Sequence, residues 1–359
     1  MLALACLLPA QAAARRAVPD GFLGVVADRT AVDGTVSLDR QMRWMRRSGA
    51  GSVGLSFTWA HAQPTAQGPY RWGSIDARVA AAVRAGLQVQ PVVIAAPGWA
   101  RVDAHQEFSP PADPEAYAAF CAALVRRYGP GGQFWAEHPA LPARPIRSWQ
   151  VWNEPVGGDG DATPSIFWPD SQPFTVRYVP LLRTAAAAIH GADPAAEVVL
   201  GALVGQSWDT LQLLYDAGAR GTFDAVALHP YTAKPANVVR IVRFVRATMR
   251  RNGDGARPIQ ITELGWPAFE ADSVRALGER KAAATQAWWL RETFERLVAR
   301  RRALGIELLL WYTWIGRDRS RSDAFDHSGL LRLREDGRLV AKPALGAFVR
   351  LARSLRRGK

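Results

Sequence analysis

The hydrophobic positions of this chain follow two alternating periods along most of its length. Residues 52–59 are apolar at every second position from Val53, which predicts a strand with one buried face. Residues 37–48 are apolar at helical spacing, begin at a serine suited to an N-cap and are followed by Gly49, which predicts a helix. The same alternation of strand and helix signals recurs to the C-terminus.

These patterns predict eight strands and eight helices. The strands are expected at residues 21–26, 52–59, 87–94, 149–152, 198–203, 223–231, 258–263 and 306–314. The helices are expected at residues 37–48, 74–85, 114–128, 179–190, 210–219, 236–250, 275–303 and from 343 onward. Pro91 falls inside the third strand, where we expect a bulge.

This order of elements, over 359 residues, is typical of an α/β protein built as a single (β/α)₈ TIM barrel. No linker or shift in composition divides residues 17–359, so we expect them to form one domain. A doubly wound open sheet is the alternative fold. It is disfavoured because no glycine-rich dinucleotide-binding fingerprint follows the first strand.

The first 16 residues are apolar and end in small residues, as in a secretory signal peptide. They lack a basic n-region, which leaves open a start further upstream, and a frayed apolar N-terminus is the alternative reading. This start leads us to expect a secreted or cell-envelope protein. No later apolar run approaches the roughly 20 residues of a membrane span. Cleavage would leave Cys121 as the one cysteine, so no internal disulfide and no Cys/His metal site are expected.

The net charge is +13, and arginines recur singly on the predicted helix faces. Solvated helix faces explain this pattern most simply. The functional alternative is attraction to an anionic cell-envelope polysaccharide. We do not expect nucleic acid as a partner, because no nucleic-acid reading motif is present. We expect a monomer.

Two glutamates stand where predicted strands become loops. Glu154 follows the fourth strand within Trp-Asn-Glu-Pro, and Glu263 ends the seventh strand before Leu-Gly-Trp-Pro. In a (β/α)₈ barrel the C-terminal strand ends form the active-site mouth, so the two carboxyl groups should face each other there. Such a pair is what glycoside hydrolysis requires, and we expect a separation of about 5–6 Å.

The segments Trp152 to Pro155 and Ile261 to Trp266 resemble motifs of the retaining (β/α)₈ glycoside hydrolases of clan A, and the nearer likeness is to family 39, the β-xylosidase/iduronidase-like family. The resemblance implies a retaining glycosidase with Glu154 as acid/base, Glu263 as nucleophile and no cofactor. It also implies that Asn153 binds the sugar 2-hydroxyl and that Tyr231 hydrogen-bonds the nucleophile. A charged Glu263 would favour the protonated form of Glu154, as this division of roles needs.

Further candidates for substrate binding lie near other strand ends. Alternation along the sixth strand places His229 on the same face as Tyr231, although a lone histidine is often structural. Aromatic faces stack well on sugar rings, and Trp314 is the preferred platform. Ordinary core packing is the alternative for each ring. The candidate tryptophans are Trp59, Trp99, Trp266, Trp311 and Trp314.

One position departs from the clan, which carries an arginine on the second strand that hydrogen-bonds the nucleophile. The matching residue here is Gly54. We therefore expect either another donor to Glu263, with Tyr231 and His229 as candidates, or a slow enzyme that Gly54→Arg accelerates. A catalytically weak or silent carbohydrate-binding barrel is the alternative function.

Overall fold

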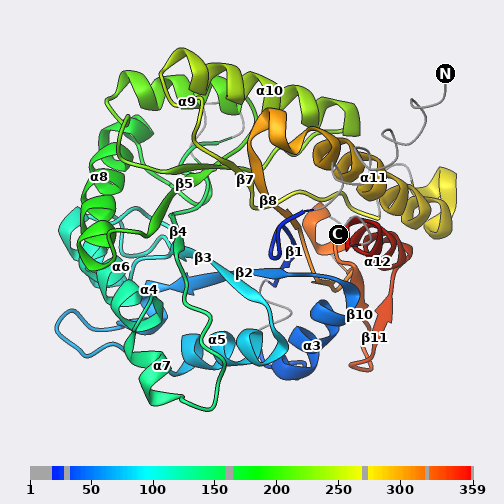
Figure 1. Ribbon diagram of the computed structural model, residues 1–359, viewed down its shortest axis with the longest axis horizontal. Coiled ribbons are helices and arrows are strands. Elements are labelled where there is room, and N and C mark those ends of the chain that lie inside the picture. Colours follow the sequence, from blue (N-terminus) through cyan, green and yellow to red (C-terminus); the bar gives the residue numbers. More distant parts are fainter. Residues whose placement is uncertain (1–17, 28–32, 158–164, 269–273, 320–322, 357–359) are drawn as a thin grey trace, which may run out of the picture.

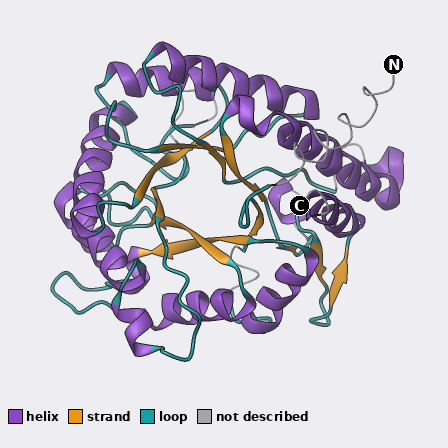
Figure 2. Cartoon of the chain, in the orientation of Figure 1, coloured by secondary structure: helices purple, strands orange, loops and turns teal. Residues whose placement is uncertain are grey.

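The computed structural model describes residues 18–27, 33–157, 165–268, 274–319 and 323–356. The expected signal segment, residues 1–16, lies outside this part of the chain. Eight parallel strands close into a barrel in the order β1 to β8, and β8 pairs with β1. Helices surround the barrel (Figures 1 and 2). The predicted α/β class and (β/α)₈ barrel are confirmed.

The barrel strands are short, and most begin within two residues of the predicted positions. They are β1 Leu23–Val26, β2 Ser52–Thr58, β3 Gln88–Ile94, β4 Ser148–Val151, β5 Glu197–Leu203, β6 Ala225–Leu228, β7 Ile259–Ile261 and β8 Ile306–Trp311. Pro91 lies inside β3 without the expected bulge. It faces Leu55 of β2 in unbroken register, and pairing with β4 begins only at Val92.

The surrounding helices include every predicted one, together with short helices after β2, after β3 and before β4. They are α3 Leu38–Ser48, α4 Trp59–Ala62, α5 Gly73–Ala85, η1 Gly98–Ala100, α6 Pro114–Tyr128, α7 Gln133–Glu137, α8 Phe174–Ala192, α9 Ser207–Asp216, α10 Pro235–Arg251, α11 Val274–Leu304 and α12 Pro343–Arg356. The helix α8 begins five residues before the predicted start, with Pro180 inside it. Burial of Phe174 and Tyr178 on one face stabilises the turns before that proline.

The helix α3 illustrates how local sequence sets these boundaries. The Ser37 side chain accepts a hydrogen bond from the backbone N–H of Arg40, which satisfies one of the unpaired donors of the first turn. At the other end Gly49 adopts a φ of 105°, a left-handed conformation that glycine takes without steric cost. The next strand, β2, can therefore begin three residues later.

The main core lies between the strands and the helices, and a second, smaller cluster consists of Val199, Ala202, Ala225 and Ala227. Ala225 and Ala227 share a face of β6, as alternation predicts. Within the described residues, no helix combines the length and apolar character needed to cross a bilayer.

A three-stranded sheet follows β8 and was not predicted. Its order is β11-β10-β9, formed by β9 (Ile315–Gly316), β10 (Leu331–Leu333) and β11 (Leu339–Ala341). The helical turn η2 (Ala324–His327) lies between β9 and β10 in sequence. In Figure 1, β10 and β11 lie outside the barrel, beside α3 and α12. Strands of two or three residues are too short to show the alternation on which the prediction depended.

Candidate active site

Glu154 stands three residues beyond the end of β4, on backbone that turns sharply. Trp152 and Glu154 have φ values of 68° and 41°, a left-handed conformation that costs a non-glycine residue about 1–2 kcal/mol. The contacts around them hold this turn in place. The Trp152 indole donates to the Phe167 carbonyl at 2.6 Å, and the Tyr178 hydroxyl donates to the Val151 carbonyl at 2.9 Å. The Glu154 carboxyl group is therefore held at a fixed strand end.

Glu263 stands two residues beyond the end of β7. The backbone N–H of Thr262 donates to the Leu228 carbonyl of β6 at 3.2 Å, which fixes the approach to the site. Beyond Glu263, the backbone of Gly265 passes so close to the Tyr312 carbonyl that a Cβ at this position would collide with the oxygen. The glycine of the Glu-Leu-Gly motif therefore allows this segment to pack against the end of β8.

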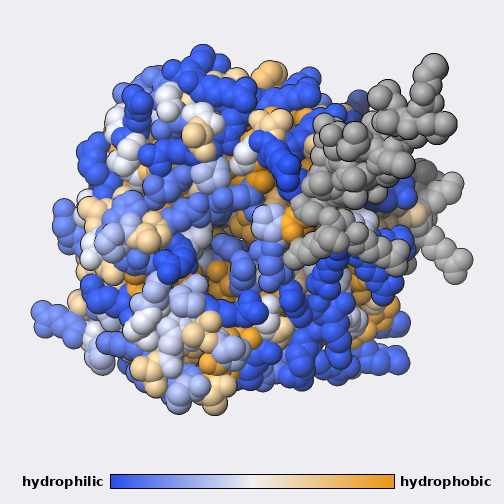
Figure 3. Space-filling model, viewed as in Figure 1, coloured by the Kyte–Doolittle hydropathy of each residue, from blue (hydrophilic) through white to orange (hydrophobic). Residues whose placement is uncertain are grey.

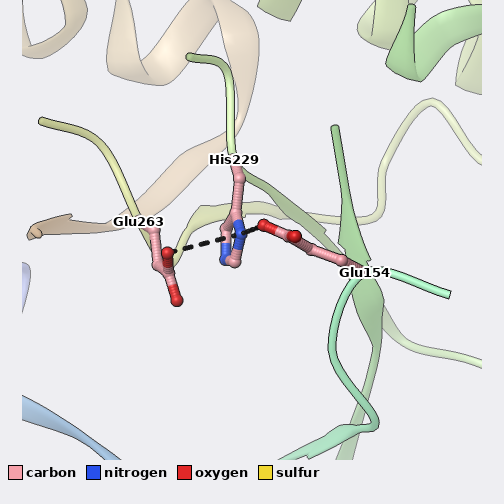
Figure 4. A group of neighbouring side chains, drawn as sticks. All are labelled: Glu154, His229 and Glu263. Carbon is pink, nitrogen blue, oxygen red and sulfur yellow. Dashed lines mark hydrogen bonds and ion pairs between the residues drawn. The ribbon is translucent and has the colours of Figure 1, made fainter. Parts of the chain in front are cut away.

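His229 lies between the two carboxyl groups and is completely buried (Figure 4). Its Nδ1 lies 2.6 Å from Glu154 Oε1 and 3.6 Å from Glu263 Oε2. Its Nε2 lies 3.1 Å from the hydroxyl of Thr262. Both ring nitrogens are thus occupied, and the imidazole cannot turn without losing one of these contacts.

The two carboxyl groups are close together. One oxygen of Glu154, one oxygen of Glu263 and one nitrogen of His229 all lie within 4.8 Å of one another. Retaining glycosidases hold their carboxyl groups about 5–5.5 Å apart, whereas inverting enzymes need about 6.5–9.5 Å to admit a water molecule. The geometry of this pair therefore suits a retaining reaction.

The charges of the pair control the protonation of its neighbours. Burial alone lowers the pKa of His229, but the negative charges of Glu263 and Glu154 outweigh it, so the pKa lies above its ordinary value. Burial, followed by the charge of Glu263, raises the pKa of Tyr231 well above its usual range. The Tyr231 hydroxyl therefore keeps its proton and donates a hydrogen bond of 2.9 Å to Glu263 Oε2.

The same three groups have the spacing of a metal site, since Glu154, His229 and Glu263 could each offer one ligand atom. A metal would require a neutral histidine with a free nitrogen lone pair. The raised pKa of His229 favours the imidazolium, which competes with metal binding.

Asn153 is buried beside this centre and accepts a hydrogen bond from Gln150, a residue that the sequence analysis did not assign to the site. The Gln150 side-chain amide donates to the Trp152 carbonyl at 3.0 Å and to Asn153 Oδ1 at 3.5 Å. Gln150 lies on β4, two residues before the turn. Alternation could have placed it on the interior face, but only the turn geometry reveals its contact with Asn153.

The tryptophans predicted to stack on sugar rings differ in exposure, and the prediction for the preferred one, Trp314, is wrong. The side chain of Trp314 is 0% exposed: its indole donates to Gln41 of α3 at 3.0 Å and packs edge-on against Trp44. The reason is that β8 ends at Trp311, so Trp314 turns outward beneath the helices. Trp59 and Trp311 are also completely buried, which excludes both as stacking platforms.

The other two predicted tryptophans differ from each other. Trp266 is buried, and its indole donates to the Thr232 carbonyl at 2.7 Å. Trp99 is 38% exposed, with its indole bonded to the Gln63 carbonyl at 3.0 Å. Of the five predicted platforms, Trp99 alone exposes a substantial part of its ring.

Two further aromatic residues, of which only Tyr312 was among the aromatics expected at strand ends, lie near Tyr231, the hydrogen-bond donor to Glu263. The Phe325 ring, 46% exposed, lies 5.1 Å from the Tyr231 ring and 5.7 Å from the Tyr312 ring. Tyr312 is half-buried directly after β8. Its position at a strand end was a usable signal, but Phe325 belongs to a polar segment without periodicity and gave none.

Gly54 is closely surrounded by side chains. A Cβ there would approach Leu310 Cδ1 to 3.1 Å and Val26 Cγ2 to 3.3 Å, so a larger residue would require these side chains to shift. The exposed residue nearer the mouth on the same face is Ser56. The donor to Glu263 that the first alternative required is present, because Tyr231 supplies it.

No known family model and no curated protein matches this sequence. Solved structures do match it. A family 39 glycoside hydrolase from the gut symbiont Bacteroides cellulosilyticus WH2 is 19% identical with a TM-score of 0.68, over 96% of this chain and 65% of that one. A monomeric β-xylosidase from Caulobacter crescentus CB15 is 16% identical with a TM-score of 0.63, over 93% and 69% of the two chains. A GH10 protein from Paenibacillus barcinonensis is 18% identical with a TM-score of 0.59, over 92% and 94%.

This chain thus spans about 65% of the length of the family 39 protein. At these identities the likeness concerns the fold. The chain has the (β/α)₈ fold of these glycoside hydrolases.

Proposed function

We propose that this protein is a retaining glycoside hydrolase acting on an oligo- or polysaccharide. The observation that carries the proposal is the pair of strand-end carboxyl groups, with oxygens within 4.8 Å of each other around a buried histidine. The glycoside hydrolase fold of the solved structures that match supports it. The mechanism needs no metal or organic cofactor.

In the first step, the Glu263 carboxylate attacks the anomeric carbon while the bond from that carbon to the leaving oxygen breaks. Glu154 gives its proton to the leaving oxygen. In the second step, Glu154 takes a proton from water, the water oxygen attacks the anomeric carbon, and the bond to Glu263 breaks. The sugar keeps its anomeric configuration, and both glutamates return to their starting states.

His229 and Tyr231 have separate roles in this proposal. The Tyr231 hydroxyl orients Glu263 and stabilises its negative charge. His229 contacts Glu154 at 2.6 Å and Glu263 at 3.6 Å, so its positive charge eases the repulsion between two carboxylates whenever both are ionised. Asn153, next to Glu154, would bind the sugar 2-hydroxyl.

The competing function is a catalytically silent carbohydrate-binding barrel. The absence of an arginine at Gly54 motivates this alternative, but the hydrogen bond from Tyr231 to Glu263 removes its main support. A screen of nitrophenyl glycosides separates the two functions. We expect hydrolysis of at least one, lost in Glu263→Gln. Binding of glycans without hydrolysis of any substrate would favour the silent barrel.

Export, a monomeric state and the absence of nucleic acid as a partner stay predictions. Sequencing the N-terminus of the protein recovered from its native cells would test export. An intact segment of residues 1–16 would contradict it.

A further inference from the structure

A hollow with a volume of about 300 Å³ lies against the three-stranded sheet that follows β8. Arginine side chains dominate its lining, with two carboxylates at one side. The charged lining residues are Arg317, Arg319, Arg332, Arg334, Glu335 and Asp336. Four guanidinium groups around one small hollow are electrostatically costly unless counter-charges offset them.

Part of the lining of the hollow belongs to a segment that follows the C-terminal end of a barrel strand. Arg317 directly follows β9, which leaves the C-terminal end of β8, and its guanidinium binds the Asp33 carboxylate at 2.8 Å. Asp33 lies in the segment that leaves the C-terminal end of β1. Both segments therefore extend from the strand ends that also carry Glu154 and Glu263.

The turn η2 links the hollow to the site. The Asp326 carboxylate accepts hydrogen bonds from the backbone N–H groups of Arg317 and Arg319, at 3.0 and 2.7 Å. The neighbouring residue, Phe325, contacts the ring of Tyr231, whose hydroxyl binds Glu263. The path from nucleophile to arginines thus passes along one partly exposed aromatic ring.

The positive charge of the hollow is incompletely neutralised by the chain. Among the residues that the structure describes, neither Arg319 nor Arg334 forms a salt bridge. The charge of Arg334 helps to lower the pKa of Asp336, but that carboxylate is paired with Arg338. Arg332 approaches Asp318 only to 4.0 Å, and Lys342 already engages that carboxylate at 3.0 Å. Guanidinium groups in such a state offer planar paired donors that suit carboxylate, sulfate or phosphate oxygens.

We propose that this hollow is a subsite for the negatively charged groups of a glycan whose chain reaches the active site past Phe325. The inference rests on the proposed function and names the substrate class as an anionic glycan. A glycan suits the path better than nucleic acid or a lipid surface does. The connecting ring can stack on the face of a sugar, and a glycan can place its charged groups in the hollow while other sugar units lie along that ring.

The test measures binding with the inactive variant Glu263→Gln, so that no glycan is consumed. The probes are matched pairs that differ in charge: polygalacturonate and its methyl ester, dextran sulfate and dextran, and phosphomannan and mannan. We expect tighter binding to at least one anionic member than to its neutral counterpart. Adding Arg319→Ala and Arg334→Ala should weaken that binding by about tenfold or more.

The control removes the same charge elsewhere, with Arg302→Ala and Arg353→Ala, two exposed arginines on α11 and α12. This control should keep the binding. The inference is overturned if no pair is distinguished by charge, if both double variants weaken binding equally, or if DNA and anionic vesicles bind as tightly as the glycan.

A separate readout tells this failure from failure of the proposed function. With Glu263 intact, Arg319→Ala plus Arg334→Ala should leave the hydrolysis of a neutral aryl glycoside unchanged. If the intact protein hydrolyses no glycoside but still selects anionic glycans through these arginines, the subsite stands and the catalytic proposal fails.

Discussion

The barrel holds a pair of glutamates at each of its two ends, in contrasting environments. At the mouth, Glu154 and Glu263 lie beyond the strand ends with the buried His229 between them. At the opposite end, Glu197 begins β5, and Glu307 is the second residue of β8. The neutral amide of Gln260 bridges this second pair, with contacts of 2.7 and 2.9 Å.

The bridging group explains why the pairs differ. Protonation of His229, which its raised pKa favours, would bring positive charge to the mouth and help a carboxylate there to stay ionised, as the proposed nucleophile must. The amide of Gln260 brings no charge. Burial, followed by the charge of Glu307, therefore raises the pKa of Glu197 from 4.5 to about 7. The first pair therefore suits the proposed catalysis, whereas in the second pair Glu197 keeps its proton to a higher pH.

Replacing one glutamate of each pair by glutamine should show most clearly which pair is needed for hydrolysis. Glu263→Gln removes the nucleophile, and we expect kcat/KM for an aryl glycoside to fall by at least about a thousandfold. Glu197→Gln is the matched control at the other end and should keep the rate within about twofold of wild type. Comparable losses in both variants would show that the mouth pair has no special role.

Glu154→Ala should produce a loss that depends on the leaving group. Poor leaving groups need protonation, so their hydrolysis should slow by about 10²–10⁴, whereas an activated nitrophenyl glycoside should suffer much less in its first step. Azide should restore turnover of the activated substrate by attacking the glycosyl enzyme. Equal losses on both substrates without rescue would remove Glu154 from the acid/base role.

The second pair should make stability depend on pH. Because folding raises the pKa of Glu197, the unfolded chain loses this proton first, and the group's contribution falls as pH rises from about 4.5 to 7. The fall should be about 3 kcal/mol at most, and constant above that window. Urea unfolding at pH 4.5 and 8 should show a smaller decline in Glu197→Gln than in wild type or in the exposed-site control Glu295→Gln. If the free energy of unfolding declined equally in Glu197→Gln and in wild type, the raised pKa of Glu197 would be refuted, and with it the contrast between the two pairs.

Of these substitutions at the mouth, Tyr231→Phe should reduce the rate of hydrolysis least. It removes a charge-assisted hydrogen bond worth about 1.5–3 kcal/mol, which corresponds to roughly ten- to a hundredfold in rate if the bond persists in the transition state. Tyr215→Phe is the control, because it removes a hydroxyl bonded to Asp254 at 2.9 Å, away from the site. Only the first substitution should slow hydrolysis, and an unaffected rate would mean that another group stabilises Glu263.

The sequence predicted the barrel and the approximate positions of both glutamates, because period-two runs that end in a carboxylate are local signals. It could not place the tryptophans. Trp314 was assigned to the mouth because an apolar run reached it, but pairing ends at Trp311, and the chain then turns outward. Only tertiary packing decides where such a run leaves a sheet.

Other features had no sequence signal at all. The strands β9 to β11 are too short to alternate. The contact of Phe325 with Tyr231 joins segments far apart in sequence, and the turn that carries Phe325 is held by the hydrogen bond from the Arg317 backbone to Asp326. The close contact at Gly54 comes from Leu310, which is distant in sequence. Contacts of this kind follow from barrel closure, which no single segment encodes.

The nucleophilic role of Glu263 can be tested most directly by trapping the intermediate. The protein would be incubated with a 2-deoxy-2-fluoro derivative of a glycoside that it hydrolyses, then digested and analysed by mass spectrometry. We expect one sugar bound per protein through an ester on the peptide that contains Glu263. A label on Glu154, or no label together with a product of inverted configuration, would contradict the retaining mechanism.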